Sequence, residues 1–301
     1  MDGKDLSRRV RQLLNEPSTS TFIDARTTYD YLYEGAKAWV LISKCLRKEQ
    51  EITIVDGTQT YTLDGDFLGH YLKEEGDFFI KYYDETNYYF LDFKPYEEII
   101  YDNNTTEQSI PDYWGITTDP TLDSQITGTA SAAGASTGGK STLAAATAKF
   151  TDVTPGDVVH NTTDASDGVI IAVATDFKSC TTCLFGGTGN DWTSADAFVI
   201  QPRGRLLLVF DPPPSTDDHT ATVYALQKPP PVYSDYDVYP FAFDYAEALA
   251  KYAAWLYKYR DSEPNMGDAF YMYFKAQAEE YGTFFRKAVG TEESRVYPRM
   301  R

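Results

Sequence analysis

The most regular pattern of apolar positions lies in the last quarter of the chain. Apolar residues recur there at steps of four and three, the spacing that places side chains on one face of a helix: Ala242, Ala246, Leu249, Ala253 and Leu256. After a break at 261–264, Ser262 can cap a second helix and Pro264 suits its first turn. Large side chains repeat the pattern up to Gly290, a residue type that favours helix ends: Met266, Phe270, Tyr273, Tyr281, Phe284 and Ala288. The pattern predicts an antiparallel helical hairpin that ends near Val289.

Two further amphipathic helices are predicted near the N-terminus. The first spans about 5–15 and ends near Pro17. The second begins after Asp24, which can cap it, and runs to about Lys48. We expect this long helix to pack on the C-terminal hairpin and to complete a helical bundle. The predicted bundle core consists of Leu32, Trp39, Leu249, Leu256, Phe270, Tyr273 and Phe284.

Between these helices the period of the apolar pattern changes from helix to strand. Ile52 and Ile54 alternate with polar residues up to Asp56-Gly57, a two-residue hairpin signal, and the return strand continues through 61–63. A second hairpin is predicted from 78–83 and 88–93, followed by a short connector at 96–101 and a strand at 111–116. Later in the chain, strands are predicted at 205–210 and 220–226, and these two can pair with each other. We expect these strands to form one small antiparallel sheet.

The segment 118–202 differs in composition from the chain on either side. It is rich in Thr, Ser, Ala and Gly, and after Pro155-Gly156-Asp157 it contains short strand signals separated by turn residues. The sequence therefore predicts an α+β protein: a helical bundle with a small antiparallel β-sheet and an inserted all-β domain. The predicted core comprises 1–117 and 203–301, the insertion 118–202, and an extended tail 291–301.

Charge and composition limit the possible functions. The 301 residues include 27 basic and 45 acidic side chains, which gives a formal net charge of −18. Such a surface repels nucleic-acid phosphates, so a general nucleic-acid binder is not expected. No apolar run is long enough to cross a membrane, the N-terminal residues lack the apolar core of a signal peptide, and three cysteines do not make a disulfide scaffold. We expect a soluble protein made in a cytoplasm.

Candidate chemical motifs do not combine into a catalytic site. The stretch 134–141, which ends Gly139-Lys140-Ser141, fits a phosphate-binding loop, but neither a buried strand before it nor a firm helix after it is predicted. Cys180 and Cys183 form a lone CxxC without a second ligand pair. The three histidines are scattered, and the acidic residues lack the spacing of a calcium loop. We therefore predict no enzyme activity, no cofactor and no metal site.

The last residues, 294–301, show no apolar periodicity. They carry three arginines and a tyrosine on an otherwise acidic protein: Arg295, Tyr297, Arg299 and Arg301. A disordered terminus is one interpretation of this segment. The other is a docking arm for an acidic neighbour, because Arg and Tyr anchor protein interfaces and opposite charge steers docking.

Several local phrases resemble the head-to-tail adaptor (connector or neck) proteins of tailed bacteriophages. Gly57, Tyr61, Leu63, Asp66 and Phe67 occupy the places of that family's "G-x-x-x-Y-x-L" strand pair and its acidic-aromatic "D-F". The stretch 111–116 is similar to its "P-x-x-Y" strand, and 206–213 with 223–225 resembles its "I-x-L-x-P-x-P … V-x-Y" pair. The closing helical hairpin also fits, and the insertion looks like a β module that recurs in phage structural proteins.

The resemblance implies a structural virion protein at the head–tail junction, assembled in the host cytoplasm. Its partners would be identical subunits in a ring, usually a dodecamer, together with the portal protein and a tail, stopper or nozzle protein. The ring would line the passage for DNA, with DNA only a non-specific neighbour and no membrane involved. The alternative is a tail or fibre-associated binding module whose β insertion recognises a glycan or another virion protein. An enzyme that uses the loop at Lys140 is the second rival.

Overall fold

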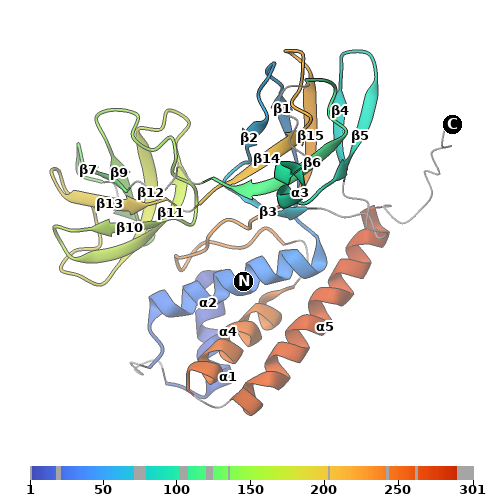
Figure 1. Ribbon diagram of the computed structural model, residues 1–301. Coiled ribbons are helices and arrows are strands. Elements are labelled where there is room, and N and C mark those ends of the chain that lie inside the picture. Colours follow the sequence, from blue (N-terminus) through green and yellow to red (C-terminus); the bar gives the residue numbers. More distant parts are fainter. Residues whose placement is uncertain are drawn as a thin grey trace. The chain divides into compact units, whose positions relative to one another are not determined.

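The computed structural model is mostly β, and the predicted α+β fold class is wrong (Figure 1). It describes residues 2–17, 22–70, 79–101, 108–119, 125–134, 136–202, 204–241, 244–261 and 264–289. In these ranges the chain forms five helices and two large sheets, one of eight strands and one of seven. A helical bundle with one small sheet does not fit, because the strands outside 118–202 form a sheet of eight strands and those inside it form a sheet of seven.

The chain divides into two compact units. One comprises Met1–Leu46 with Pro240–Arg301, and the other comprises Arg47–Tyr239. Both sheets belong to the second unit, so the unit boundary separates the sheets from the helices near the two ends of the chain. The domain bounds that the sequence predicts place the helices in one domain with the strands outside 118–202. That assignment stays a prediction. None of the described helices is both long and apolar enough to cross a membrane.

The helical unit contains α1 (Gly3–Leu14), α2 (Ala25–Ser43), α4 (Ala246–Arg260) and α5 (Pro264–Val289). The cap predicted at Asp24 is confirmed, because its side chain accepts a hydrogen bond from the backbone N–H of Thr27. The start of the last helix at Pro264 is also confirmed. Helices α4 and α5 contact each other, and both contact α2. The predictions for Ala242, Ser262 and Gly290 concern residues outside those that the structure describes.

The core of the helical unit differs in part from the predicted one. Leu32, Trp39 and Leu249 are buried, whereas Leu256 and Phe270 are only partly buried. Tyr273 is 38% exposed and Phe284 is 51% exposed, so their assignment to the core was wrong. The buried apolar side chains among the described residues of α5 are Phe274, Ala278 and Tyr281, and of these only Tyr281 belongs to the predicted stripe.

One glycine, Gly282, explains which face of α5 is buried. A Cβ at Gly282 would lie 2.9 Å from the Cα of Ser43, so α2 and α5 approach each other closely at this point. The close approach selects the face that contains Gly282, Phe274 and Ala278. Aromatic residues occur in adjacent pairs along α5, as in Tyr273-Phe274, so apolarity alone does not define which member is buried.

The eight-stranded sheet has the strand order β1-β15-β4-β5-β6-β14-β2, with β3 also paired to β15. Its strands are β1 (Arg47–Thr53), β2 (Thr60–Thr62), β3 (Phe67–His70), β4 (Phe79–Tyr83), β5 (Tyr88–Phe93), β6 (Tyr113–Thr118), β14 (Leu206–Asp211) and β15 (Thr220–Gln227). Inward-pointing side chains of nearly every strand, together with Ile54 and Leu63 beside β1 and β2, form one apolar core that includes Ile80, Tyr82, Trp114, Phe210 and Val223.

Some predicted strand pairings are confirmed and others are wrong. The hairpin of β4 and β5 is confirmed. The turn at Asp56-Gly57 does not join a hairpin, because β1 pairs with β15 and β2 pairs with β14. Likewise β14 and β15 do not pair with each other. The sheet is not purely antiparallel, since β5 and β6 run parallel, and the predicted connector between them is a short helix, α3 (Tyr96–Tyr101).

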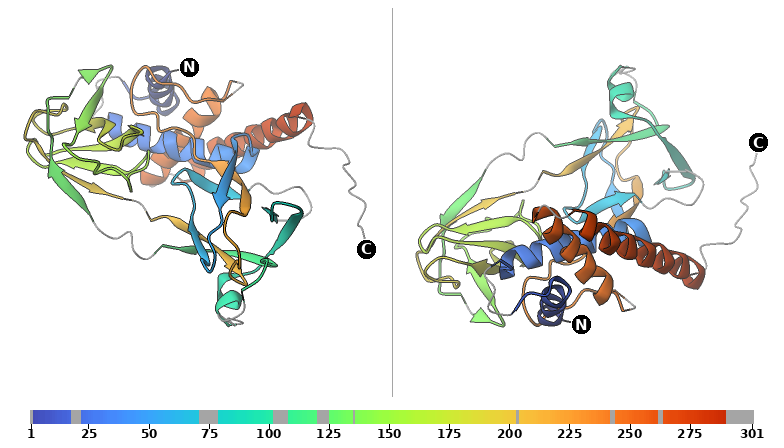
Figure 2. Two further views of the ribbon diagram at one scale, coloured as in Figure 1. Left: turned by 90° about the horizontal axis from the view of Figure 1, so that it is seen from above. Right: turned by 90° about the horizontal axis from the view of Figure 1, so that it is seen from below.

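The seven-stranded sheet contains β7 (Ile126–Thr129), β8 (Ser136–Thr137), β9 (Lys140–Ala144), β10 (Val158–Asn161), β11 (Ser166–Val173), β12 (Ser179–Phe185) and β13 (Ala197–Gln201). Their order is β7-β13-β10-β11-β12-β9-β8, with every pair antiparallel. Its core is built around Phe150, Trp192 and Phe198. All seven strands therefore come from the Thr-, Ser- and Gly-rich part of the sequence, and Figure 2 shows them from two further directions.

Candidate functional site

The residues that the sequence analysis proposed for docking are not among those that the structure describes. Arg295, Tyr297, Arg299 and Arg301 all follow residue 289, where the description of the chain ends. Their role in docking stays a prediction. The site is therefore built from the described residues of the sheets.

The stretch that matches a phosphate-binding loop is a β-hairpin. Thr137 pairs with Lys140, and Gly138 and Gly139 form the turn with φ values of 62° and 79°. A strand, β9, follows the glycines where a phosphate-binding loop requires the N-terminus of a helix. The ammonium of Lys140 lies 2.7 Å from a carboxylate oxygen of Asp237, so its charge is already paired.

The cysteines and histidines do not gather into a reactive group. Cys180 and Cys183 lie three residues apart on β12, so they point to opposite faces of the sheet. Burial raises the pKa of Cys180 to about 12, which keeps it a thiol. Among the described residues, no group of three or more His, Cys, Asp or Glu side chains is placed to hold a metal ion.

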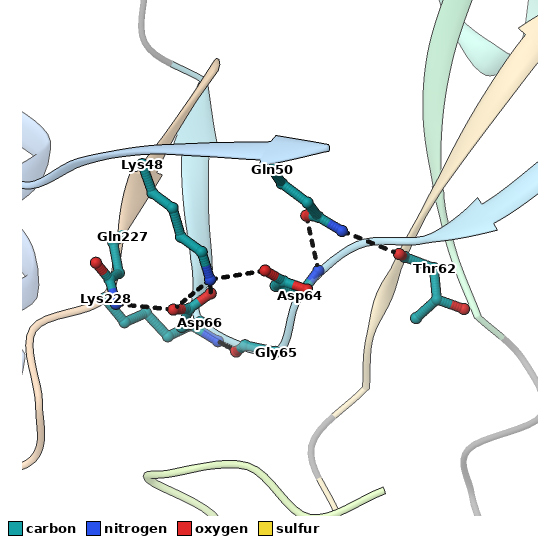
Figure 3. Close-up of polar contacts among 8 residues, drawn as sticks. All are labelled: Lys48, Gln50, Thr62, Asp64, Gly65, Asp66, Gln227 and Lys228. Carbon is teal, nitrogen blue, oxygen red and sulfur yellow. Dashed lines mark hydrogen bonds and ion pairs between the residues drawn. The ribbon is translucent and has the colours of Figure 1, made fainter. Parts of the chain in front are cut away.

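A polar cluster lies where the two edges of the eight-stranded sheet approach each other (Figure 3). From β1, the Lys48 ammonium lies 2.6 Å from Asp64 and 3.0 Å from Asp66. Asp66 also accepts a 2.8 Å hydrogen bond from the amide of Gln227 at the end of β15. Lys228 donates its ammonium to the carbonyl of Gly65 at 2.8 Å.

Gln50 connects the same two edges one row further along β1. Its side-chain oxygen accepts a 3.0 Å hydrogen bond from the backbone N–H of Asp64, and its amide nitrogen donates to the carbonyl of Thr62. Tyr61 adds a third link, since its hydroxyl exchanges hydrogen bonds with the N–H and the carbonyl of Val55. Side chains thus join edge strands that lack a backbone ladder between them. We call the cluster of Lys48, Gln50, Asp64, Asp66 and Gln227 the seam.

The electrostatics of the seam favour a structural role for Lys48. Partial burial lowers the pKa of Lys48, but hydrogen bonds and charge from Asp64 and Asp66 outweigh that effect, and the net pKa is raised. An amine with a raised pKa stays protonated and cannot act as a nucleophile or a general base at neutral pH. The ammonium therefore serves to hold the two carboxylates, and with them the two edges of the sheet. An open depression of about 470 Å³ adjoins it, lined by Arg47, Lys48, Glu49, Tyr224 and Ala225.

A second notable feature is the side of the eight-stranded sheet that points away from its core. Tyr83 lies opposite Tyr88, and Lys81 lies opposite Phe90, in the β4–β5 ladder. Asp92 of β5 is level with Tyr113 of β6. Because neighbouring residues in register share a face, all of these side chains point outward. We call this surface the aromatic face: Lys81, Tyr83, Tyr88, Phe90, Asp92 and Tyr113.

The aromatic face is exposed and already holds cations on its rings. Tyr88 and Phe90 are each 58% exposed. The Lys81 ammonium lies 3.8 Å from the centre of the Tyr88 ring, and that of Lys94 lies 5.0 Å from the centre of the Tyr113 ring. Both contacts are of the cation–π type. Exposed aromatic rings grouped in this way are typical of protein interaction sites.

Helix α3 borders the aromatic face next to Tyr113. Gly115 follows two residues later on the same side of β6, and a Cβ there would lie 2.8 Å from the Cδ1 atom of Ile99. The glycine therefore lets α3 pack directly on the strand. Ile99 is buried by this contact, whereas Ile100 and Tyr101 remain exposed at the end of the helix.

Sequence reasoning missed both the seam and the aromatic face. The aromatic face did have a signal: residues 88–93 read Tyr-Tyr-Phe-Leu-Asp-Phe, which is apolar on both sides of a strand. A strand with one solvated face normally alternates, so the extra aromatics indicate a second contact surface. The seam had no such signal, because it depends on which strands form the two edges of the sheet.

No family model matches the chain, and a search of curated proteins gives no match.

Proposed function

We propose that this chain is a structural virion protein, a head-to-tail adaptor that forms an oligomeric ring between the portal and tail or neck proteins of a phage. The observation that carries the proposal is the aromatic face. An acidic chain with a net charge of −18 resists non-specific association, so a group of exposed rings on one sheet supports a specific protein interface. The proposed role is that of an assembly protein without enzyme activity.

The place of the resembling phrases in the fold gives further support. The stretches 57–67, 111–116, 206–213 and 223–225 are far apart in sequence, yet all contribute to the eight-stranded sheet. Tyr61 and Asp66 make defined contacts in or beside the seam, and Leu63 and Phe67 are buried. The residues that carry the resemblance therefore all belong to the eight-stranded sheet or lie directly beside its strands. The resemblance also implies that β1 and β2 pair with each other, whereas β1 pairs with β15 and β2 pairs with β14.

The acidic charge also suits the proposed position in the virion. A ring that surrounds a DNA passage must let the phosphate backbone move, and like charges on the wall and the DNA repel each other. In this proposal DNA is a non-specific neighbour, and the bound partners are identical subunits, the portal and a tail or stopper protein.

The test is the mass of the purified chain in solution, measured alone and after mixing with portal rings from the phage that encodes it. We expect a stoichiometric ring on the portal. We also expect that a chain lacking residues 295–301 still folds but no longer attaches, because the cationic arm docks on the portal or on a neighbouring subunit. A chain that ignores the portal and forms trimers alone would contradict the proposal and favour the fibre-associated binding module.

A further inference from the structure

The chain passes between its two compact units at two places, after Leu46 and after Tyr239. At the first place, residues 44–46 separate α2 from β1. At the second, residues 228–245 separate β15 from α4. The second connection is much longer than the first, so its contacts decide how freely the two units can move. We call its part 229–239 the strap.

The strap packs on the seven-stranded sheet. Val232 and Tyr233 are buried, although they belong to no helix or strand. The centre of the Tyr233 ring lies 6.4 Å from that of Phe185 on β12. Phe185 and Cys183 point away from the core of this sheet, because Leu184 between them belongs to that core, and yet Cys183 is fully buried. The strap therefore covers part of the outer side of β12.

The hairpin of β8 and β9 holds the strap near its far end. The Lys140 ammonium lies 2.7 Å from one carboxylate oxygen of Asp237, and the other oxygen accepts a 2.8 Å hydrogen bond from the Ser234 hydroxyl. At the turn of the hairpin, a Cβ on Gly138 would lie 3.3 Å from the Tyr236 ring. Gly138 and Lys140 both belong to the stretch that matches a phosphate-binding loop. In the structure these two residues receive the strap.

The beginning of the strap is fixed to the eight-stranded sheet. The backbone N–H of Lys228 donates a 2.7 Å hydrogen bond to the carbonyl of Asp66. The Lys228 ammonium donates to the neighbouring carbonyl of Gly65, as described for the seam. The strap is therefore attached at both ends, to the turn after β2 at one end and to the β8–β9 hairpin at the other.

Attachment at both ends shortens the second connection between the units. A released connection of residues 228–245 could span about 60 Å, whereas the residues 240–245 that follow an attached strap span at most about 20 Å. Domains joined by linkers move relative to each other unless their interface is large and apolar. The contacts of the strap therefore lie where they can limit such motion.

We propose that the β8–β9 hairpin is a latch for the strap, through which the seven-stranded sheet restricts the motion between the two compact units. In the latched state Asp237 pairs with Lys140, and Tyr236 lies against Gly138. In the released state this pair is broken, and all of 228–245 links the units. The paired side chains are 30% and 27% exposed, so water reaches them and the latch can open without leaving a charge in an apolar site. The inference goes beyond the adaptor function and does not rest on it.

The experiment measures distances between the two units in the full chain. Nitroxide labels are placed on Gln12→Cys in α1 and on Thr86→Cys in the β4–β5 turn, both exposed positions, and double electron–electron resonance gives the distribution of distances. The parent chain, whose three cysteines are buried, is the blank. We expect Lys140→Glu to widen the distribution at least about twofold, because release roughly triples the reach of the second connection. An unchanged width would overturn the proposal.

A charge reversal makes the test specific to the ion pair. The double variant Lys140→Glu with Asp237→Lys restores a pair of opposite orientation, and we expect it to return most of the way to the width of the parent. The matched control is Lys178→Met, which removes an exposed lysine of the same sheet and should leave the width unchanged. Thermal unfolding checks that each variant keeps its fold. A double variant as wide as Lys140→Glu would overturn the role of the pair.

Hydrogen exchange of the same variants follows the strap itself. We expect the amides of residues 232–239 to exchange about fivefold faster in Lys140→Glu than in the parent, the upper range for loss of a partly exposed ion pair. Raising the salt concentration from 0.1 to about 1 M should act in the same direction on the parent, because the pair is screened. A wider distribution without faster exchange in the strap would overturn the latch, since the units would then move while the strap stays attached.

Discussion

At the scale of single residues, the seam shows how a few side chains can take the place of a backbone ladder. Edge strands present unpaired N–H and carbonyl groups, and proteins protect them by charge, by covering or by closure. Here the Gln50 side chain donates to the carbonyl of Thr62 and accepts from the N–H of Asp64 on the opposite edge. The Lys48 ammonium pairs with the Asp64 carboxylate, in the turn that follows β2. The edges are therefore occupied by side-chain contacts that leave little room for an incoming strand.

The seam leads to a stability prediction. Lys48→Met is expected to lower the free energy of unfolding by about 1–2 kcal/mol, because Asp64 and Asp66 lose their shared cation in a partly buried site. Lys275→Met, which breaks a mostly exposed helix pair with Glu279, is the control and is expected to cost no more than about 0.5 kcal/mol. Urea unfolding measures both. Equal effects of the two variants would show that the seam contributes no more than a surface ion pair.

His70 gives a pH-dependent prediction. Burial lowers its pKa to about 4 from an ordinary value of 6.5, and its ring packs against Trp114 and Phe67. The unfolded chain therefore binds a proton that the folded chain does not, and the stability from His70 is complete above pH 6.5 and is lost as the pH falls toward 4. Between pH 7.5 and 5 the loss is about 2 kcal/mol.

Urea unfolding at several pH values tests this dependence. The variant His70→Phe keeps a ring at the position but cannot titrate, so its stability should change less between pH 7.5 and 5. The control Thr53→Ser alters an exposed side chain of the same sheet that does not titrate, and it should keep the slope of the parent. Parallel slopes for His70→Phe and the parent would rule out His70 as the titrating group.

At the scale of elements, local patterns predicted the helices and strands better than they predicted which strands pair with each other. Asp24 as a cap, the β4–β5 hairpin and the start of α5 at Pro264 follow from a few adjacent residues, and the structure has all three. The pairing of β1 with β15 joins residues more than 160 positions apart, and nothing near Asp56-Gly57 encodes it. A turn signal defines a change of direction; the strands that flank it are free to pair elsewhere.

Neighbouring residues in the sequence also do not predict which helix face is buried or which side chains form the candidate site. The exposed Tyr273 and the buried Phe274 are neighbours of similar size, and a glycine eight positions further on, Gly282, selects between them through its contact with Ser43. The aromatic face is visible in the sequence only as apolar residues in excess along 88–93. Tyr113 comes from β6, which the sheet order places beside β5, so the sequence alone does not group it with Tyr88 and Phe90.

At the scale of the whole molecule, the two compact units have separate apolar cores, with Trp39, Phe274 and Tyr281 in one and Ile80, Phe210 and Val223 in the other. Chains with more than one such unit commonly unfold in more than one step. We therefore expect calorimetry of the full chain to resolve at least two transitions. This expectation also decides how the stability variants are interpreted, since each change should act on the unit that contains it.

Two matched core variants test this independence. Phe274→Ala opens a cavity in the helical unit, and Leu208→Ala opens one in the eight-stranded sheet; both side chains are fully buried, and each change is expected to cost about 2–5 kcal/mol. Because the cores are separate, each variant should lower the temperature of one transition and leave the other unchanged. A single transition that both variants shift equally would mean that the units unfold cooperatively. The helices would then depend on the sheets for their stability, and a subunit in the proposed ring would act as one rigid block.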